Sequence, residues 1–498
     1  EYAFHHPLTH HVAYSAQLRD RRAHIHAEIA SALIEVNSDE LDVRAALIAH
    51  HWERADQLLE AARWNRKAAD WLTRSEPSEA ERHWQKVRDL TSSLPSSPER
   101  DELLLHASTQ IIVLGVRLGL PETDADEIFE TARRVGEQRN DRRELAQLHN
   151  AYGMFKGMSG AGEAAVQSIM EAERYAAEIG DCEIQLSVRV SVAVWLLHRG
   201  QLSDALQLIQ QGIDLADGDL SLGADIVGFS PLAFLTLYRG TVRATMGDLA
   251  AARVDLQAAL DMARRSHESE LECMTVGFMA VITFYEGDRE MTLSYALQAM
   301  EVATRVGSPF ILAFAQGIVG TARRMREEWD EAATALRAEL EITREHRTGL
   351  LVEAVSIANL AEVYLGQGNL AKAMQTADEA VAVARQRGSR VFECDALLAK
   401  FDVLLRADSG DSLLEAQTAL DAAAAIIKDT GAHSRTPLLW EKRAALARAR
   451  SDASGFASAM HEARQAYERM KATGHLTRIE RELTATTSLE WMPVVSID

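Results

Sequence analysis

The hydrophobic pattern of the chain is helical over nearly its whole length, and polar turns interrupt it at regular intervals. Apolar residues recur at spacings of three and four, which is typical of amphipathic helices. The turns begin at positions 160, 200, 247, 287, 328, 368 and 411, so successive steps are 40, 47, 40, 41, 40 and 43 residues. Five of these positions are glycines: Gly160, Gly200, Gly247, Gly287 and Gly368.

A second pattern lies within each repeated unit. The fifth residue after each turn position is small, which allows close approach of neighbouring helices: Ala165, Ala205, Ala252, Thr292, Ala333, Ala373 and Ala416. Further glycines follow the second helix of successive units, where a left-handed C-cap favours glycine: Gly307, Gly349, Gly388, Gly431 and Gly474. Some of the next helices open with a Ser-Pro or Thr-Pro cap: Ser230-Pro231, Ser308-Pro309 and Thr436-Pro437.

Repetition at this period predicts an all-α fold, a right-handed superhelical solenoid of about ten helical pairs. Each pair has an apolar face that it cannot bury alone, so stacking of neighbours builds a continuous core. The repeats are expected over residues 102–475. Residues 476–498 are expected to form a capping helix or a disordered tail.

The N-terminal part reads differently. In segment 1–36 a helix is expected over residues 12–36, with one apolar face made by Ala13, Leu18, Ile25, Ile29 and Leu33. Segment 37–101 predicts two or three helices and a Ser/Pro-rich turn at residues 91–98. It is also rich in tryptophan, and we expect these side chains in the core: Trp52, Trp64, Trp71 and Trp84.

Composition and charge exclude several classes of protein. No stretch of about 18 apolar residues is present, so no membrane span is expected. The net charge of −21 makes the chain a poor nucleic-acid binder. The three cysteines suggest neither a disulfide framework nor a zinc site, which fits a reducing cytoplasm: Cys182, Cys273 and Cys394.

No catalytic constellation is evident in the sequence. There is no phosphate-binding loop, no H-E-x-x-H zinc motif and no G-x-S-x-G nucleophile elbow. The histidine-rich start, His5, His6, His10 and His11, has no spacing that forces three or four ligands together, so no metal is expected. Arg323, Arg324 and Arg326 are expected to be solvated. We therefore expect no enzyme and no cofactor in this chain.

Residues 359–374, NLAEVYLGQGNLAKAM, resemble a tetratricopeptide repeat, and residues 235–263 resemble it as well. The period is nearer 40 than the usual 34 or so. In this respect the chain is more similar to the superhelical sensor region of the maltose-regulon activator and related ATP-dependent regulators.

A second resemblance lies at the N-terminus. The order of residues there is similar to a recurring segment of signal-transduction ATPases, at the end of the winged-helix part of the ATPase module. The matching positions are Phe4, His6, Leu8, Val12, Ala13, Tyr14, Arg22 and His26. The resemblance implies that residues 1–36 are a winged-helix remnant and contact an ATPase module of the same polypeptide. Bacterial proteins of this build often carry a class III nucleotide cyclase ahead of the ATPase.

These observations predict a non-catalytic sensor and scaffold. Its concave groove would bind a protein, a peptide or a small ligand, and binding would gate an upstream ATPase and nucleotide cyclase. Since the chain begins with Glu1, we expect it to be a piece of a longer polypeptide. Two alternatives stay open: the sensor arm of an ATP-dependent transcriptional activator, which predicts a helix-turn-helix domain after the repeats, and a free-standing tetratricopeptide-like adaptor.

Overall fold

The computed structural model describes residues 14, 18–36, 40–73, 76–407 and 410–488. In this part of the chain every regular element is a helix, with 24 α-helices and two short 3-10 helices. The predicted all-α fold is confirmed. The handedness of the superhelix stays a prediction.

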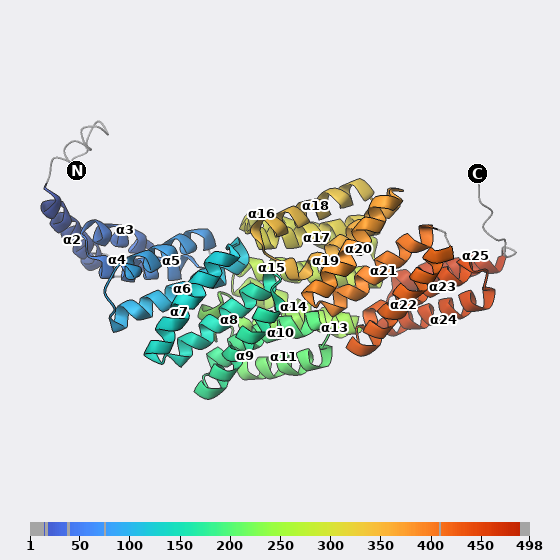
Figure 1. Cartoon of the computed structure of the whole chain (residues 1–498), viewed down its shortest axis with the longest axis horizontal. Helices are drawn as coiled ribbons and strands as arrows, with labels where there is room; N and C mark the ends of the chain where they lie inside the picture. Colours follow the sequence, from blue (N-terminus) through green and yellow to red (C-terminus); the bar gives the residue numbers. More distant parts are fainter. Residues whose placement is uncertain (1–13, 15–17, 37–39, 74–75, 408–409, 489–498) are drawn as a thin grey trace. The chain divides into compact units, whose positions relative to one another are not determined.

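The helices fall into two compact units (Figure 1). Unit 1 comprises residues 1–115 and 122–152, and unit 2 comprises residues 116–121 and 153–498. Helices α6 and α8 each contribute to both. The boundaries predicted at residues 36, 101 and 475 stay predictions.

Unit 1 contains α2 (Arg19–Val36), α3 (Leu41–Arg54), α4 (Leu58–Leu72), α5 (Pro77–Ser92), most of α6 (Pro98–Leu118), α7 (Glu122–Arg139) and the first part of α8 (Arg142–Met158).

The helix predicted over residues 12–36 is present as α2 from Arg19 to Val36. The apolar positions in and beside it are largely exposed: Leu18 is 79% exposed, Ile29 is 38% exposed, and Ala30 is the one buried residue of α2. Residues 12 and 13 lie outside the described residues. Trp84 is buried as predicted, but Trp71 is exposed on the outer side of α4. Three helices do occupy residues 41–92, with a turn before Pro98.

Unit 2 is built from repeated helix pairs, which we call helix A and helix B of each pair. The pairs are α10 with α11, and then α13 with α14 through α23 with α24. The tetratricopeptide-like pairing is therefore confirmed. The bounds are α9 (Gly162–Ile179), α10 (Cys182–Arg199), α11 (Leu202–Ala216), α12 (Ala224–Val227), α13 (Pro231–Met246), α14 (Leu249–Arg265), α15 (Ser269–Glu286), α16 (Arg289–Val306), α17 (Pro309–Met325), α18 (Trp329–His346), η1 (Leu350–Val352), α19 (Glu353–Gly366), α20 (Leu370–Arg387), α21 (Arg390–Ala407), α22 (Gly410–Thr430), η2 (His433–Arg435), α23 (Thr436–Ala449), α24 (Ala453–Met470) and α25 (Thr473–Ser488).

The sequence period corresponds to the packing of these pairs. All seven small residues at the fifth position are buried, with at most 2% of their surface exposed. The five predicted turn glycines all have left-handed backbone, with φ between 76° and 92°. Gly474 is an exception among the predicted C-caps, because it lies inside α25 and Lys471, with φ 57°, ends α24 instead.

The predicted Ser-Pro and Thr-Pro caps form in one case of three. The Ser230 side chain accepts a hydrogen bond from the Ala233 N–H, as a cap does. The Ser308 hydroxyl instead donates to the Glu270 carboxylate at 2.9 Å, so it makes no cap bond. Thr436 is already the first residue of α23, because η2 precedes it.

The later repeats of unit 2 fold back onto the turns of the earlier ones. We call residues 153–306 the early repeats and residues 309–488 the late repeats. The Arg387 guanidinium donates to the Gly160 carbonyl at 3.0 Å, and the Ser434 hydroxyl donates to the Thr245 carbonyl at 2.8 Å. His475 Nε2 lies 3.2 Å from the Phe284 carbonyl oxygen. These contacts join residues about two hundred positions apart, and they enclose the space between the helices.

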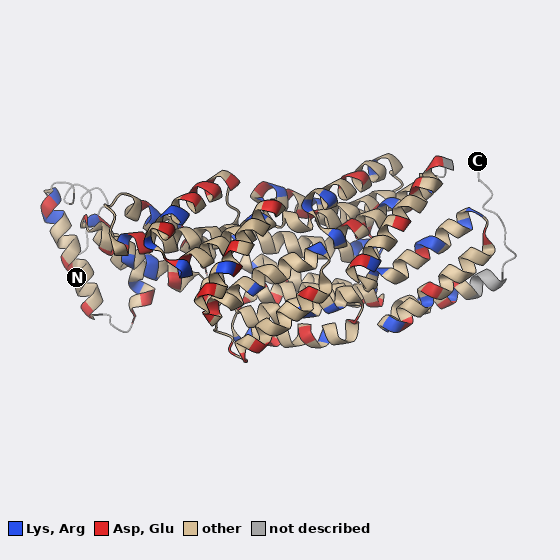
Figure 2. Cartoon of the chain, turned by 60° about the horizontal axis from the view of Figure 1, so that its bottom comes forward, with Lys and Arg blue, Asp and Glu red and all other residues tan. Residues whose placement is uncertain are grey.

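Charge is distributed over the whole chain. Figure 2 shows Asp and Glu along the helices of both units, with Lys and Arg interspersed among them. Among the described helices, none combines the length and the apolar character that crossing a bilayer requires.

Candidate functional site

Unit 2 encloses a cavity of about 340 Å³ between the early and the late repeats. Its wall is made mainly by A helices, with contributions from α10, α13, α15, α17, α19 and α21. The B helix α18 contributes Glu339 and Thr343. The concave surface expected from the repeats is therefore largely covered by the chain itself.

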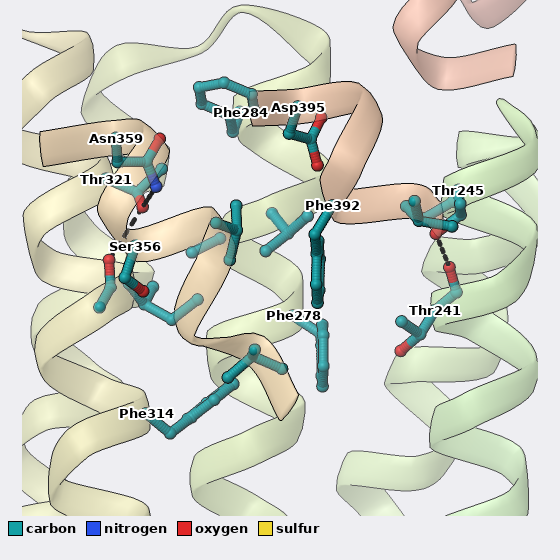
Figure 3. A pocket seen from close by; sticks show the side chains of 18 of the residues that line it. Thr241, Thr245, Phe278, Phe284, Phe314, Thr321, Ser356, Asn359, Phe392 and Asp395 are labelled. Atoms are coloured by element: carbon teal, nitrogen blue, oxygen red, sulfur yellow. Dashed lines mark hydrogen bonds between the residues drawn. The ribbon is translucent and has the colours of Figure 1, made fainter. Parts of the chain in front are cut away.

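Four aromatic side chains line the cavity. Phe278, Phe284, Phe314 and Phe392 come from three different helices, and Phe278 and Phe392 lie near each other (Figure 3). The rings of Phe278 and Phe314 lie 5.5 Å apart between centroids, inclined at 52°. All four are only partly buried, because each leaves part of its ring facing the cavity. Such a wall suits an apolar or aromatic group of a ligand.

A carboxyl group also lines the cavity. Glu339 of α18 is 5% exposed, and one of its oxygens accepts a hydrogen bond from the Ser356 hydroxyl. Its other oxygen, Oε2, has no hydrogen-bond partner among the described residues. Burial raises the pKa of Glu339 to about 8, against the opposing effect of the Ser356 bond, and the nearby Glu353 adds to the rise. Gly317 of α17 leaves room for this carboxyl, since a Cβ there would lie 2.6 Å from Oε2.

Near Ser356, two further polar side chains join neighbouring A helices. The Asn359 amide of α19 donates to the Thr321 hydroxyl of α17 at 3.0 Å (Figure 3). Both residues line the cavity. The polar side of the cavity is thus held by bonds between α17, α18 and α19.

The third polar element is His198, in the last turn of α10. Its side chain lines the cavity and lies 5.3 Å from the Phe392 ring between centroids. The ring nitrogen Nδ1 is buried and lacks a hydrogen-bond partner within the part of the chain that the structure describes. Burial lowers the pKa of His198 to about 4, so the ring is neutral at pH 7.

Acidification should therefore destabilise unit 2 through His198. Its folded pKa is about 4, below the ordinary histidine pKa of 6.5, so the unfolded chain takes up a proton first as the pH falls. The contribution of His198 to stability should be constant above pH 6.5 and decrease below it, by about 2 kcal/mol at pH 5. Glu339, whose folded pKa is raised to about 8, contributes in the opposite sense, so the original chain is compared with the His198→Asn variant, in which the Glu339 contribution is the same. Urea unfolding of both at several pH values should show this decrease in their difference, and a difference that does not change with pH would contradict the prediction.

Two buried ion pairs complete the wall. Arg324 of α17 pairs with Glu362 of α19, and Arg435 of η2 pairs with Asp395 of α21 at 2.9 Å. The expectation that Arg324 is solvated was wrong, because its side chain is only 16% exposed and faces the cavity. Arg323 and Arg326 pair with Glu328, an acidic neighbour expected to balance them, and their side chains are partly buried.

The N-terminal site predicted from the family resemblance is only partly described. Phe4, His6 and Leu8 lie outside the described residues. Tyr14, Arg22 and His26 do come together.

The Tyr14 hydroxyl lies 2.9 Å from His26 Nε2, and the Arg22 guanidinium lies 5.0 Å from the centre of the Tyr14 ring. The other ring nitrogen of His26 is 2.8 Å from His51 Nδ1, so α2 and α3 are joined there. Burial, followed by nearby charges, lowers the pKa of both histidines. Contact of this cluster with an ATPase module stays a prediction.

Metal ligation and thiol chemistry were considered for the described residues. Within the searched part of the chain, no three His, Cys, Asp or Glu side chains are arranged to hold a metal ion. The thiols of Cys273 and Cys394 are buried, and burial raises the pKa of both. Neither is therefore a ready nucleophile.

The sequence did not single out Glu339, His198 or the four phenylalanines. Each occupies a normal position of an amphipathic helix, and Glu339 is one of many carboxylates. One signal was present: Glu339 belongs to the buried side of α18, between the buried residues Leu336 and Leu340.

Comparisons with known proteins show a likeness of fold. No family model matches the chain, and no curated protein sequence matches it. A Rap protein solved in complex with competence and sporulation factor is 13% identical, with a TM-score of 0.44 over 82% of this chain and 99% of that chain.

The Rap conjugation gene regulator of plasmid pLS20, solved with the Phr* peptide, is also 13% identical, with a TM-score of 0.47 over 76% of this chain and 96% of that chain. A signal-transduction ATPase with a tetratricopeptide repeat sensor from Pyrococcus horikoshii is 12% identical, with a TM-score of 0.35 over 87% of this chain and 85% of that chain. At such identities the likeness concerns the fold alone.

Proposed function

We propose that unit 2 is a ligand-binding sensor domain whose cavity takes a small organic molecule, or one side chain of a peptide. The observation that carries this proposal is a cavity lined by aromatic side chains and by two residues with a buried polar atom, Glu339 Oε2 and His198 Nδ1, that has no hydrogen-bond partner among the described residues. About 340 Å³ falls within the usual size range of small-molecule pockets.

A structural origin of the cavity explains these features less well. Protein interiors are packed about as densely as organic crystals, and voids larger than a water molecule are few. A buried polar atom without a partner costs about 1–3 kcal/mol. A ligand that fills the space and satisfies Glu339 and His198 would remove both costs.

The position of the cavity supports a sensing role. Its wall includes Phe278 of the early repeats and Phe392 of the late repeats, so one ligand would contact both. A ligand that prefers one arrangement of these repeats shifts the population toward it by its differential affinity. Binding would therefore stabilise the closed arrangement of unit 2.

The neutral fluorescent probe N-phenyl-1-naphthylamine tests this proposal without assuming a charge on the ligand. We expect saturable binding at one site per chain, with enhanced fluorescence. The Val355→Trp variant should abolish binding, because Val355 is a half-buried cavity residue and an indole there would occupy the space. Val254→Trp is the matched control, since Val254 is 68% exposed on α14.

Equal fluorescence titrations of the two variants would contradict the proposal, provided that circular dichroism shows both to be folded. Absence of saturable binding to the original chain would contradict it as well.

We also propose an output for this sensor, supported by the resemblance of the N-terminal residues to signal-transduction ATPases. Ligand binding in unit 2 would gate an upstream ATPase and nucleotide cyclase. Cyclic nucleotide formation by the whole polypeptide, measured with and without the probe, tests this output. A change in DNA binding instead would favour a transcriptional activator, and capture of a protein partner without either effect would favour an adaptor.

A further inference from the structure

We propose that the cavity of unit 2 selects a monovalent organic cation, an ammonium group carried by an apolar or aromatic body. The ammonium group would bind the Glu339 carboxylate, and the body would lie against the phenylalanine wall. This inference rests on the proposed ligand-binding function and names the class of ligand.

Around the cavity, one carboxyl group has no counter-ion among the described residues. Arg324 is paired with Glu362, and Arg435 is paired with Asp395, so these charges cancel. Burial lowers the pKa of the two lining histidines, His198 and His475, so both are neutral at pH 7. Burial also raises the pKa of the three lining tyrosines, Tyr238, Tyr285 and Tyr467, so they are neutral as well. Among the described residues of the wall, the carboxyl of Glu339 is then the acidic group that has no basic partner. When it is ionised, the cavity has the charge that a single cation neutralises.

The geometry around Glu339 fits a donor from a ligand. One carboxyl oxygen is held by the Ser356 hydroxyl, which fixes the orientation of the group. The other oxygen, Oε2, accepts no hydrogen bond from the described residues. The Glu339 side chain lines the cavity and is only 5% exposed. An ammonium N–H would satisfy this oxygen with a charge-assisted hydrogen bond, the stronger kind.

The aromatic wall favours the same charge. The faces of Phe278, Phe314 and Phe392 carry the negative part of the ring quadrupole, which attracts a nearby cation. The faces of the same rings would repel an anion, and so would the Glu339 carboxylate. A neutral alcohol could donate to Oε2, but without the charge term.

Binding of such a cation should release a proton. In the empty cavity Glu339 is mostly protonated at pH 7, because burial raises its pKa to about 8. The charged groups packed around it do not reverse this: Glu353 of α19 is paired with Arg344 of α18 and with Arg387 of α20. Only the ionised carboxylate pairs with a cation. Affinity for the cation should therefore rise with pH up to about 8, and then level off until the amine of the ligand loses its own proton.

Three probes of similar shape test whether the cavity prefers a cation, a neutral molecule or an anion: 4-phenylbutylammonium, 4-phenylbutanol and 4-phenylbutyrate. Isothermal titration of the full chain at pH 8 should show the ammonium binding roughly 10- to 100-fold more tightly than the alcohol, and the carboxylate binding most weakly. At pH 7, titrations in two buffers of different ionisation enthalpy should show release of up to one proton per ammonium bound, and none for the alcohol.

Two variants of α18, each with one glutamate replaced by glutamine, provide a test and its matched control. Glu339→Gln should reduce the affinity for the ammonium to that for the alcohol and abolish proton release. Glu341→Gln should change neither, because Glu341 is exposed on the same helix. Gly317→Ala gives a second approach, since its Cβ would displace the Glu339 carboxyl and should weaken ammonium binding more than alcohol binding.

The outcomes distinguish this inference from the function on which it rests. If the alcohol or the carboxylate binds as tightly as the ammonium, or if Glu339→Gln keeps the preference, the ligand class is wrong and the ligand-binding function stands. If neither these probes nor N-phenyl-1-naphthylamine binds, both fail. Should Glu339→Gln not fold, the probe series and the proton release of the original chain decide the question.

Discussion

Replacing Gly287 with alanine should destabilise unit 2 by about 3 kcal/mol, whereas the same replacement at Gly307 should cost about 1 kcal/mol. Both glycines follow a helix of the early repeats in left-handed backbone, with φ of 82° and 74°. The conformational cost of alanine is therefore the same at both positions. The difference lies beyond the turn: a Cβ on Gly287 would be 2.6 Å from the His475 backbone nitrogen, and one on Gly307 would meet nothing within 4 Å.

The nearest of these atoms, His475 N, and the Gly474 carbonyl carbon at 3.0 Å belong to backbone, so they cannot move aside as a flexible side chain would. Urea unfolding of the two variants gives the difference in unfolding free energy directly. Hydrogen exchange should show that Gly287→Ala loosens α25, while Gly307→Ala leaves its protection unchanged. Equal destabilisation of the two variants would mean that the late repeats do not pack on this turn in solution.

The same close packing should affect the cavity. His475 lines the cavity and also makes the contact with the Phe284 carbonyl next to this turn. Moving α25 away would open the wall on that side. Gly287→Ala should therefore weaken binding of the fluorescent probe as well, which Gly307→Ala should not do.

The sequence predicted the turns but not what they contact. Gly287 and Gly307 look alike in the chain, because each ends an amphipathic helix and precedes the next one. They differ because Gly287 contacts residues nearly two hundred positions later and Gly307 does not. A local sequence pattern cannot predict such a distant contact. The repeat period specifies which helices pair. It does not specify where the array folds back onto itself, because this depends on small rotations that accumulate from pair to pair.

The candidate site shows the same limit. The small residues at the fifth position were predicted from their period, and all are buried. Glu339 and Arg324 could not be assigned in this way, because carboxylates and guanidinium groups are frequent on the solvated faces of helices. Their burial depends on neighbouring helices that cover them. The resemblance at the N-terminus did place Tyr14, Arg22 and His26 in one segment, and these three meet in the structure.

Removing the carboxylate of Asp395 should destabilise unit 2 by about 3–5 kcal/mol. Asp395 accepts two hydrogen bonds from the Arg435 guanidinium, at 3.0 and 2.9 Å. Arg435 is 6% exposed, and a guanidinium keeps its charge at any pH that the fold survives. In Asp395→Ala the charge would remain buried without its partner.

This pair also connects the late repeats to the early ones. Arg435 donates a third hydrogen bond to the Ser434 hydroxyl, and that hydroxyl donates to the Thr245 carbonyl of α13. Loss of Asp395 should therefore loosen the contact of η2 with α13, as well as lower the unfolding free energy. Hydrogen exchange of the last turn of α13 reports the first effect, and urea unfolding reports the second.

Glu171→Ala is the matched control for Asp395→Ala. Glu171 also pairs with an arginine, Arg174, but both side chains are nearly half exposed, so its removal should cost less than 1 kcal/mol. The double variant Asp395→Ala, Arg435→Met should regain much of the stability that Asp395→Ala loses, because it removes the unpaired buried charge. If the double variant is no more stable than the single one, the cost comes from lost packing or from the broken link to Thr245, and the buried charge is not its cause.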